Sequence, residues 1–263
     1  MRRLVPPALL EKQTTYKQFC LYEIESILRR GRNGEETTIS MSGDWAACPE
    51  ATILFQSLFK AVRAESKLSA EILDIDGMSG RKYRFFINDV IATLPNARYL
   101  EIGSWAGSTA CSAMYGNNVE VTCIDDWSEF GGPKQKFLEN VQLARSVSTN
   151  FKLIEADFRQ VDYSTIGRFN TFLFDGPHNE HAHYDGIRLV QPALEDTFIL
   201  VVDDWNWPEV RTGTLRGIAD EKLERLFSIE IRSTQDNTHP KGVVGKRSDW
   251  HNGYILCVCR KAT

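Results

Sequence analysis

Acidic side chains and a histidine follow two neighbouring apolar runs in the second half of the chain. Asp175 and His178 follow the first run, and Asp203 and Asp204 follow the second. Hard cations such as Mg²⁺ prefer oxygen ligands in octahedral geometry. A histidine titrates near neutral pH, which suits a general base. Three converging aspartates therefore predict a divalent-cation site, with an ionisable base close to it.

A glycine-containing loop follows an earlier apolar run. Gly103 and Gly107 stand four residues apart, so the backbone can pass close to a ligand there. A pyrophosphate-binding loop needs the spacing G-x-G-x-x-G, which argues against a nicotinamide or flavin dinucleotide. The carboxylate of Glu101, at the start of the loop, repels phosphate and suits a cationic group. A structural glycine turn is the alternative.

Two further apolar runs also end in acidic residues. One is followed by Asp125, Asp126 and Trp127, and the next leads to Asp157 and Phe158. A carboxylate at the end of a strand can accept hydrogen bonds from both ribose hydroxyls, so we expect Asp125 or Asp126 to hold a ribose. Asp157 then takes an adenine amino group, and Phe158 packs on the ring. In the alternative, each acid caps the following helix.

These motifs need parallel strands that end at one edge of a sheet. From about residue 76, short apolar runs alternate with amphipathic stretches, which predicts an α/β, Rossmann-like, mostly parallel sheet. The last two strands lack a long helix between them, so we expect an antiparallel strand at the sheet edge. The seven predicted strands are residues 98–102, 120–124, 151–154, 171–174, 198–202, 226–231 and 254–259.

The first part of the chain has a different pattern. Apolar residues recur at helical spacing over residues 16–28 and 51–73, with a polar loop at residues 31–42 between them. We therefore expect a helical N-terminal extension over residues 1–75 and a catalytic domain over residues 76–263.

Composition and charge limit the class of protein. The 263 residues are 42% hydrophobic and 25% charged with a net charge of −4, which indicates a globular protein and argues against nucleic acid as a partner. The six cysteines show no C-x-x-C spacing, and no run of about 18 apolar residues occurs. We expect a cytoplasmic protein with no membrane partner. A homo-oligomer is compatible with the sequence.

Together, the glycine loop and the acids after the second and third strands resemble the class I S-adenosylmethionine-dependent methyltransferases, over residues 76–263. The loop pattern E-x-G-x-x-x-G-x-S/T is similar to that of their small-molecule O-methyltransferase branches, although many class I members have glycine where this chain has Trp105. The resemblance implies S-adenosylmethionine as cofactor. It implies cofactor contacts from Met78, Ser79, Gly80, Glu101, Gly103, Ser104, Gly107, Ser108, Thr109, Asp125, Asp126, Trp127, Asp157, Phe158 and Asp175.

The acids after the fourth and fifth strands are similar to those of catechol-type and macrocin-type O-methyltransferases. That resemblance implies Asp175, Asp203 and Asp204 as ligands of Mg²⁺. It also implies His178 as general base, with Asp175 as the second catalytic residue. The metal would lower the pKa of an acceptor hydroxyl and orient its oxygen. The implied reaction is methylation of an oxygen of a small-molecule or sugar-like acceptor.

Several alternatives stay open at this stage. Asp203 and Asp204 can instead cap the next helix, and His178 can be a surface residue. A transition-metal site with His181 and His183 is disfavoured, because the three histidines do not share one helical face. For the whole chain, the alternatives are a non-catalytic S-adenosylmethionine-binding regulatory module and a nicotinamide-dependent oxidoreductase.

The long polar segment between the last two strands, residues 232–253, is either disordered or a functional loop, and in the second case we expect it to form a lid over the acceptor pocket. Trp205, Trp207 and Trp250 are the aromatic residues that we expect to line that pocket, with core or surface packing as the alternative.

Overall fold

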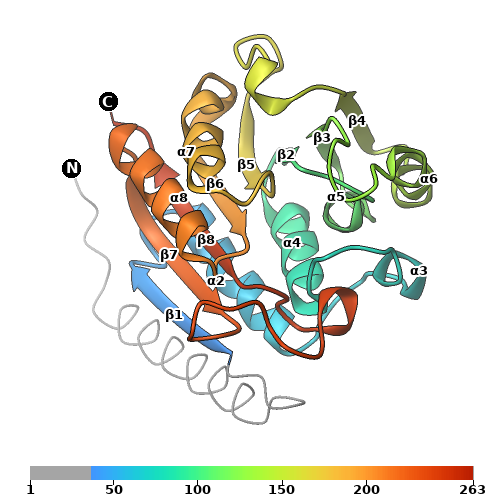
Figure 1. The fold of residues 1–263 in the computed structure, drawn as a ribbon, viewed down its shortest axis with the longest axis horizontal. Coiled ribbons are helices and arrows are strands. Elements are labelled where there is room, and N and C mark those ends of the chain that lie inside the picture. Colours follow the sequence, from blue (N-terminus) through green and yellow to red (C-terminus); the bar gives the residue numbers. More distant parts are fainter. Residues whose placement is uncertain (1–36, 263) are drawn as a thin grey trace. The chain divides into compact units, whose positions relative to one another are not determined.

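The computed structural model describes residues 37–262, which form an eight-stranded mixed sheet with helices on both faces (Figure 1). The predicted α/β, Rossmann-like class is confirmed, with one strand more than expected. The predicted helix at residues 16–28 lies outside the described residues. No helix within residues 37–262 has the length and apolar content that crossing a membrane requires.

The strand order across the sheet is β1-β7-β8-β6-β5-β2-β3-β4. Strands β6, β5, β2, β3 and β4 run parallel, and the pairs β6–β8, β7–β8 and β1–β7 are antiparallel. The strands are β1 (Thr38–Gly43), β2 (Arg98–Ile102), β3 (Val119–Ile124), β4 (Thr149–Ile154), β5 (Phe169–Phe174), β6 (Leu194–Asp203), β7 (Glu224–Arg232) and β8 (Tyr254–Arg260).

The helices form two layers. Contacts join α2 to α4, α4 to α5 and α5 to α6 in one layer, and Figure 1 shows α7 and α8 side by side in the other. The helices are α2 (Pro49–Val62), α3 (Ala70–Leu73), α4 (Arg81–Thr93), α5 (Ser108–Met114), α6 (Lys134–Ala144), α7 (Glu180–Leu189) and α8 (Pro208–Asp220), with short 3₁₀ turns η2 (Phe158–Gln160), η3 (Gln191–Ala193) and η4 (Gly245–Arg247).

Side-chain alternation along the strands explains the two layers. Leu100 and Ile102 of β2 point to one face and join the core cluster that contains Ala182 of α7. Tyr99 and Glu101 therefore point to the opposite face, and both are fully buried there. Strands that are covered on both faces consist of continuous apolar runs in the sequence, which is why the sequence predicts these strands.

The register of the parallel strands aligns their carboxyl ends. Ile102 of β2 pairs with Ile124 of β3 and with Phe174 of β5, and Phe174 pairs with Val202 of β6. Ile124 pairs in turn with Ile154 of β4. The residues that follow these five strands therefore leave the sheet side by side along one edge.

Two features of the first 75 residues differ from the sequence predictions. Residues 38–43 form β1 rather than a loop, because their backbone pairs with β7 and supplies the antiparallel edge strand. The predicted helix at residues 51–73 is interrupted after Val62, since Ala64 adopts a left-handed conformation with φ of 58°. The division of the chain at residue 75 stays a prediction.

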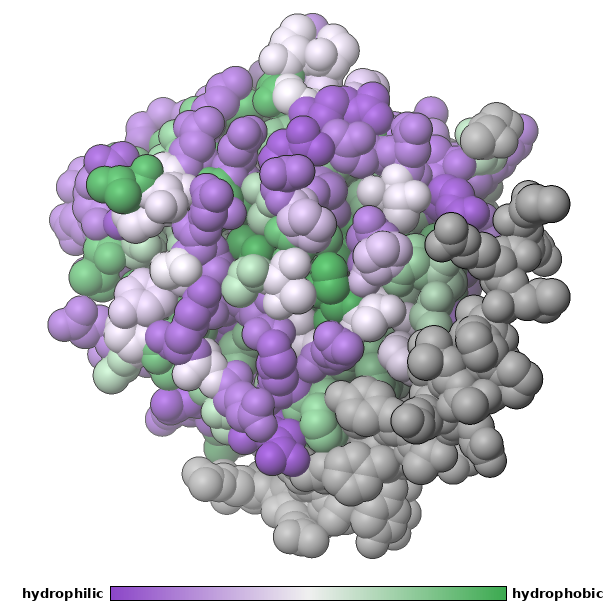
Figure 2. All heavy atoms as spheres, turned by 180° about the vertical axis from the view of Figure 1, so that it is seen from behind, coloured by the Kyte–Doolittle hydropathy of each residue, from purple (hydrophilic) through white to green (hydrophobic). Residues whose placement is uncertain are grey.

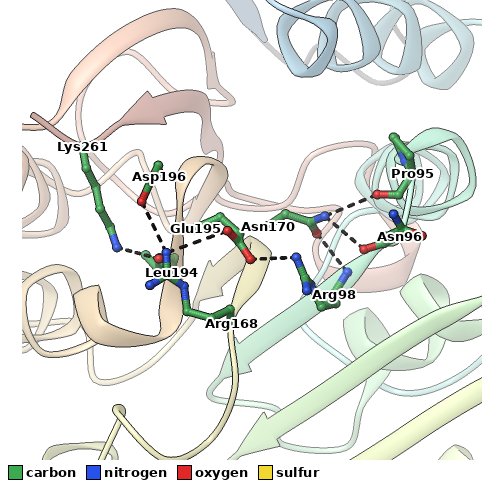
Figure 3. A network of polar contacts seen from close by, with 9 residues as sticks. All are labelled: Pro95, Asn96, Arg98, Arg168, Asn170, Leu194, Glu195, Asp196 and Lys261. Carbon is green, nitrogen blue, oxygen red and sulfur yellow. Dashed lines mark hydrogen bonds and ion pairs between the residues drawn. The ribbon is translucent and has the colours of Figure 1, made fainter. Parts of the chain in front are cut away.

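A polar network joins the strands at the sheet edge opposite to their carboxyl ends (Figure 3). Nη2 of Arg98 donates to Glu195 at 2.7 Å, and the backbone N–H of Arg98 donates to Oδ1 of Asn170 at 2.9 Å. Nζ of Lys261 donates to the carbonyl of Leu194 at 2.5 Å. These contacts link the beginnings of β2, β5 and β6, so the network is structural.

Candidate active site

A cavity of about 220 Å³ lies where the carboxyl ends of the parallel strands meet. Such an edge is the usual ligand site of open α/β sheets. The cavity is lined by Met78, Ile102, Gly103, Trp105, Ile124, Asp125, Asp126, Ser128, Glu129, Phe130, Ala156, Asp157, Phe158, Arg159, Asp175, Gly176, Pro177 and His178. Residues that follow β2, β3, β4 and β5 thus share one pocket.

The predicted cofactor residues divide into two groups in the structure. Those that line the cavity are Met78, Gly103, Asp125, Asp126, Asp157, Phe158 and Asp175. Those outside the lining are Ser79, Gly80, Glu101, Ser104, Gly107, Ser108, Thr109 and Trp127. The sequence reasoning did not assign a contact to Trp105, Phe130 or Arg159, which also line the cavity. Nothing in their spacing distinguishes them from ordinary loop residues.

Gly103 holds the glycine loop close to the next strand end. Its φ is 85°, and a Cβ built on it would lie 1.8 Å from the carbonyl oxygen of Asp175. Only glycine fits this combination of left-handed backbone and close approach. The loop therefore lies directly against the residue that begins the acidic cluster.

The side chain of Asp125 orders the glycine loop by accepting hydrogen bonds from backbone N–H groups of that loop. Oδ2 of Asp125 accepts hydrogen bonds from the N–H groups of Ser104 and Trp105, both at 2.7 Å, and Oδ1 accepts from the N–H of Trp127 at 2.7 Å. The indole of Trp127 donates to the carbonyl of Trp105 at 2.9 Å. Trp105 and Trp127 both have positive φ, at 45° and 51°. Asp125 stabilises these two strained turns as well as lining the cavity.

Glu101 lies beneath the loop on the other face of the sheet. The hydroxyl of Tyr99 donates to its Oε2 at 2.5 Å, and its Oε1 has no hydrogen-bond partner in the described part of the chain. Burial raises the pKa of Glu101 to about 7. Oγ of Ser104 is also buried without such a partner. Oε1 of Glu101 can therefore accept a further hydrogen bond, either from the Ser104 hydroxyl or from a bound donor.

The acidic cluster contains a histidine. Ligand atoms of Asp175, His178 and Asp204 all lie within 4.8 Å of one another. Nε2 of His178 lies 2.9 Å from Oδ2 of Asp204. The predicted third metal ligand, Asp203, accepts the backbone N–H of Asp204 on its Oδ1 at 2.7 Å and does not belong to this group.

A residue that the sequence reasoning missed completes the cluster. Nδ2 of Asn252, from the segment before β8, donates to Oδ1 of Asp204 at 2.7 Å. Asp204 has a left-handed φ of 59°, so both of its carboxylate oxygens are fixed on a strained backbone. No spacing in the sequence indicates this pairing, because the two residues come from different loops.

Electrostatics sets the protonation of the cluster. Burial raises the pKa of Asp175 well above its usual value, and the charges of Asp203 and Asp204 raise it further. Burial lowers the pKa of His178, but the hydrogen bond and charge of Asp204 outweigh it and raise the pKa overall. The same partner lowers the pKa of Asp204 against the effect of its burial. The pair therefore favours a protonated His178 and an ionised Asp204.

Aromatic rings extend from the cavity past the cluster. The ring of His178 lies 6.0 Å from Phe130 and 5.1 Å from Trp207, measured between centroids, and Trp207 lies 6.2 Å from His239. We call Phe130, His178, Trp207 and His239 the ring row. The four residues come from four different loops, so the row exists only in the folded protein.

Of the three tryptophans expected at the acceptor pocket, only Trp207 belongs to the ring row. Trp205 and Trp250 are both buried in the protein interior, with 1% of their surface exposed. Trp205 joins the core cluster between the sheet and the helices, and its indole donates to Glu230 at 3.1 Å. The expectation was therefore wrong for these two residues, because packing rather than the loop position decides their environment.

The other two histidines of the motif are separated from the cluster. His183 is buried against Phe174, and burial lowers its pKa to about 3. His181 lies on the exposed side of α7, 3.3 Å from Asp185. Within residues 37–262, only His178 joins the acids, so the rival transition-metal site with three histidines does not form.

Residues 100–205 match a methyltransferase domain. This family model covers the glycine loop, the acids after β3 and β4, and the acidic cluster up to Trp205. The matched segment makes up less than half of the chain. A search of curated proteins found no match to this chain.

Several solved structures share the fold. TrmN from Thermus thermophilus is 13% identical with a TM-score of 0.49, over 73% of this chain and 52% of that one. A proposed RNA methyltransferase from Pyrococcus horikoshii is 12% identical (TM-score 0.46; 82% and 99% covered), and a proposed O-methyltransferase from Klebsiella pneumoniae is 16% identical (0.45; 82% and 93%). This chain spans about half the length of the first three structures that it matches.

The expectation about nucleic acid is corrected here. A negative net charge argued against such a partner, but the proteins of similar fold include a proposed RNA methyltransferase and an rRNA methylase. Net charge describes the whole surface, and it does not determine the charge of a single binding face. The argument against a nucleic-acid partner is therefore withdrawn.

Proposed function

We propose that this chain methylates a hydroxyl oxygen of a small-molecule or sugar-like acceptor, with S-adenosylmethionine as methyl donor and a divalent cation beside it. One observation carries the proposal. The cavity bordered by Gly103, Asp125 and Asp157 is continuous with Asp175 and His178, so a donor pocket adjoins a group of ionisable side chains. A binding module without catalysis has no need of that second group.

The residues present fit the cofactor. Asp126 and Asp157 provide carboxylates at the cavity wall for a ribose and an adenine amino group, and Phe158 provides an apolar face. The unsatisfied oxygens of Glu101 and Ser104 at the base of the loop fit a cationic amino-acid end. When bound, S-adenosylmethionine supplies an electrophilic methyl group on a sulfonium centre.

The donor set also fits a divalent cation. Asp175 and Asp204, whose ligand atoms lie within 4.8 Å of one another, are proposed ligands, because Mg²⁺ prefers carboxylate oxygens to imidazole nitrogen. Asp203 is the third proposed ligand through its Oδ2 alone, since its Oδ1 accepts the backbone N–H of Asp204 and the residue lies outside that group. When bound, such a cation lowers the pKa of an acceptor hydroxyl and orients its oxygen. It would also compensate the negative charge of Asp204 and favour ionisation of Asp175 and Asp203, whose pKa values are raised without it. None of these three carboxyl groups pairs with a lysine or arginine of the described residues at ion-pair distance.

His178 is the proposed general base. Its imidazole lines the cavity and forms the ring row, so it faces both sides where donor and acceptor would meet. Nε2 is hydrogen-bonded to Asp204, which orients the ring. Because Nε2 donates to Asp204, the nitrogen that would accept the proton is Nδ1, and it does so only in the deprotonated fraction of His178, which the raised pKa makes smaller.

The ring row supports a ring-shaped acceptor. Phe130 is 58% exposed and Met78 is 42% exposed, and both line the cavity. On the face shown in Figure 2, hydrophilic side chains predominate and hydrophobic ones stand in small groups. Of the exposed large apolar side chains in the described part of the chain, Phe130 and Met78 are the two that lie at the cavity, where they can contact a ligand.

The deciding experiment is calorimetric titration with S-adenosylhomocysteine and with NAD, each with and without Mg²⁺. We expect binding of the first compound and not of the second. Transfer of a labelled methyl group is then screened against hydroxylated small molecules, sugars and RNA. Binding of NAD alone would refute the proposal, and transfer to RNA alone would refute the acceptor class while leaving the methyl donor in place.

A further inference from the structure

Arg84 carries a buried charge that the proposed reaction does not use. Its side chain, on α4, is fully buried. Nε donates to Oγ of Ser79 at 3.0 Å, and Nη1 donates to the carbonyls of Leu73 at 3.2 Å and Ile75 at 2.9 Å. Nη2 is buried and has no hydrogen-bond partner in the described part of the chain.

No carboxylate of the described residues lies within ion-pair distance of this guanidinium. Asp76, an acid close enough to affect Arg84, is instead held by Nζ of Lys246 at 2.9 Å. A buried charge without a partner is costly, and such groups are normally paired or bound to a ligand. Arg84 stays charged all the same, because burial lowers its pKa only to about 10.

The position of Arg84 relates it to the cavity. Oγ of Ser79, which accepts from Arg84, lies 2.8 Å from Oγ of Ser108 at the start of α5. A Cβ built on Gly77 would lie 2.1 Å from Oγ of Ser108 and 3.3 Å from Nη2 of Arg84. The next residue, Met78, lines the cavity. The guanidinium therefore lies against the turn at residues 77–80, of which Met78 lines the cavity and Ser79 contacts the start of α5.

We propose that Arg84 is a positioning residue for the carboxylate at the amino-acid end of the cofactor, acting through Ser79 and the turn at residues 77–80. Its positive charge would attract the carboxylate, and its hydrogen bonds fix the turn that lies over it. This inference rests on the proposed function, since it assumes a donor with an amino-acid end. The cofactor's carboxylate then supplies the counter-charge that the fold lacks.

The test compares two ligands, of which only one has an amino-acid end. S-adenosylhomocysteine carries the carboxylate, and 5′-methylthioadenosine lacks the amino-acid end. Calorimetry measures both affinities for the unmodified chain and for Arg84→Gln, Arg84→Lys and Ser79→Ala. Arg81→Gln is the matched control, because Arg81 lies on the same helix with an exposed side chain. Thermal unfolding confirms that each variant is folded.

We expect Arg84→Gln to lower the affinity for S-adenosylhomocysteine about tenfold or more and to change the affinity for 5′-methylthioadenosine less than about twofold. Arg84→Lys keeps the charge and should recover part of the loss, and Arg81→Gln should change neither affinity. If Arg84→Gln does not fold, Ser79→Ala and Arg84→Lys must show the same selective loss, of smaller size.

If the substitution weakens the binding of both ligands equally, Arg84 only maintains the fold. If neither affinity changes, the charge of Arg84 does not influence ligand binding. Either result overturns the inference and leaves the proposed function intact. If the unmodified chain binds neither nucleoside, the proposed function fails and this inference fails with it.

Discussion

The side-chain amide of Asn252 donates a hydrogen bond of 2.7 Å to Oδ1 of Asp204, across 48 residues of chain. The other oxygen of that carboxylate contacts His178, so Asn252 and His178 together fix Asp204 from two sides. Asn252 is fully buried and also accepts a hydrogen bond from Asn206 at 3.1 Å. The segment before β8 thus orients a side chain of the acidic cluster.

Replacement of Asn252 by alanine should therefore disturb the cluster. Loss of a buried hydrogen bond to a charged group costs about 1–3 kcal/mol of unfolding free energy. We expect methyl transfer to fall about tenfold, because Asp204 loses one of its two constraints. Denaturant unfolding and initial rates measure the two effects. A stability loss with an unchanged rate would show that Asn252 supports the fold alone.

Metal binding should depend on the aspartates and not on His178. We expect Asp204→Asn and Asp203→Asn to weaken Mg²⁺ binding in calorimetry, and EDTA to abolish turnover in the unmodified chain. His178→Gln should retain Mg²⁺ and lose methyl transfer. The reverse pattern, with Mg²⁺ lost in His178→Gln and retained in Asp203→Asn, would place the histidine among the ligands and remove it as base.

Gly103→Ala should abolish cofactor binding. A Cβ at this position meets the carbonyl oxygen of Asp175 at 1.8 Å, so the loop must move away from β5. Gly131→Ala is the control, because Gly131 has a similar φ of 80° with nothing within 4 Å of its Cβ position. That variant shows the cost of the left-handed backbone alone, about 1–2 kcal/mol. Binding of S-adenosylhomocysteine by Gly103→Ala would contradict the proposed role of the loop.

Two buried histidines should make the fold sensitive to acid. Burial lowers the pKa of His183 to about 3 and that of His251 to about 4, so both stay neutral in the native state. Unfolded histidine takes up a proton near pH 6.5, so unfolding binds protons as the pH falls from about 6.5 to 4. The two groups therefore reduce stability in that range, each by about 1.4 kcal/mol per pH unit.

The variant His183→Leu isolates this effect. The partly buried Asp175 and the buried Asp203 have raised pKa values and act in the opposite direction, so the difference between variant and unmodified chain is the useful quantity. We expect the stability of His183→Leu to fall less steeply with acid. Urea unfolding at pH 7, 6 and 5 measures this slope, and parallel curves for the two proteins would show that His183 does not titrate on unfolding.

The polar network at the far edge of the sheet supplies a negative control. Glu195 is about one-third exposed and pairs with Arg98 at 2.7 Å. Glu195→Ala should cost about 1 kcal/mol of stability or less, as for other partly exposed ion pairs, and leave nucleoside binding unchanged. A loss of binding in this variant would show that the site responds to general destabilisation, and the site variants would then need reinterpretation.

The sequence predicted the elements that short-range patterns of apolar and polar residues determine. The inner parallel strands are buried on both faces and consist mainly of apolar residues. Gly103 and Asp125 follow two of them, and Asp157 follows the edge strand β4, all at the side of the sheet where the cavity lies. In contrast, β1 is a short edge strand whose side chains are mostly exposed, so its only strong determinant is backbone pairing with β7.

The interactions missed by the sequence reasoning are long-range. Asn252 and Asp204 come from loops whose meeting depends on the sheet order, and a lone asparagine gives no signal of its own. Arg84 looks like an ordinary charged residue of an amphipathic helix until its burial is known. Asp203 and Asp204 are adjacent in sequence, yet the chain directs one to a backbone amide and the other to His178.

The place of β8 has a consequence for the order of assembly. Because β8 lies between β6 and β7, those two strands have no partner on their facing edges until residues 254–260 have been synthesised. Asn252, which directly precedes β8, reaches Asp204 only after that insertion. A nascent chain that already contains every residue of the cavity lining would therefore still lack a finished acidic cluster, which forms late, when the sheet closes.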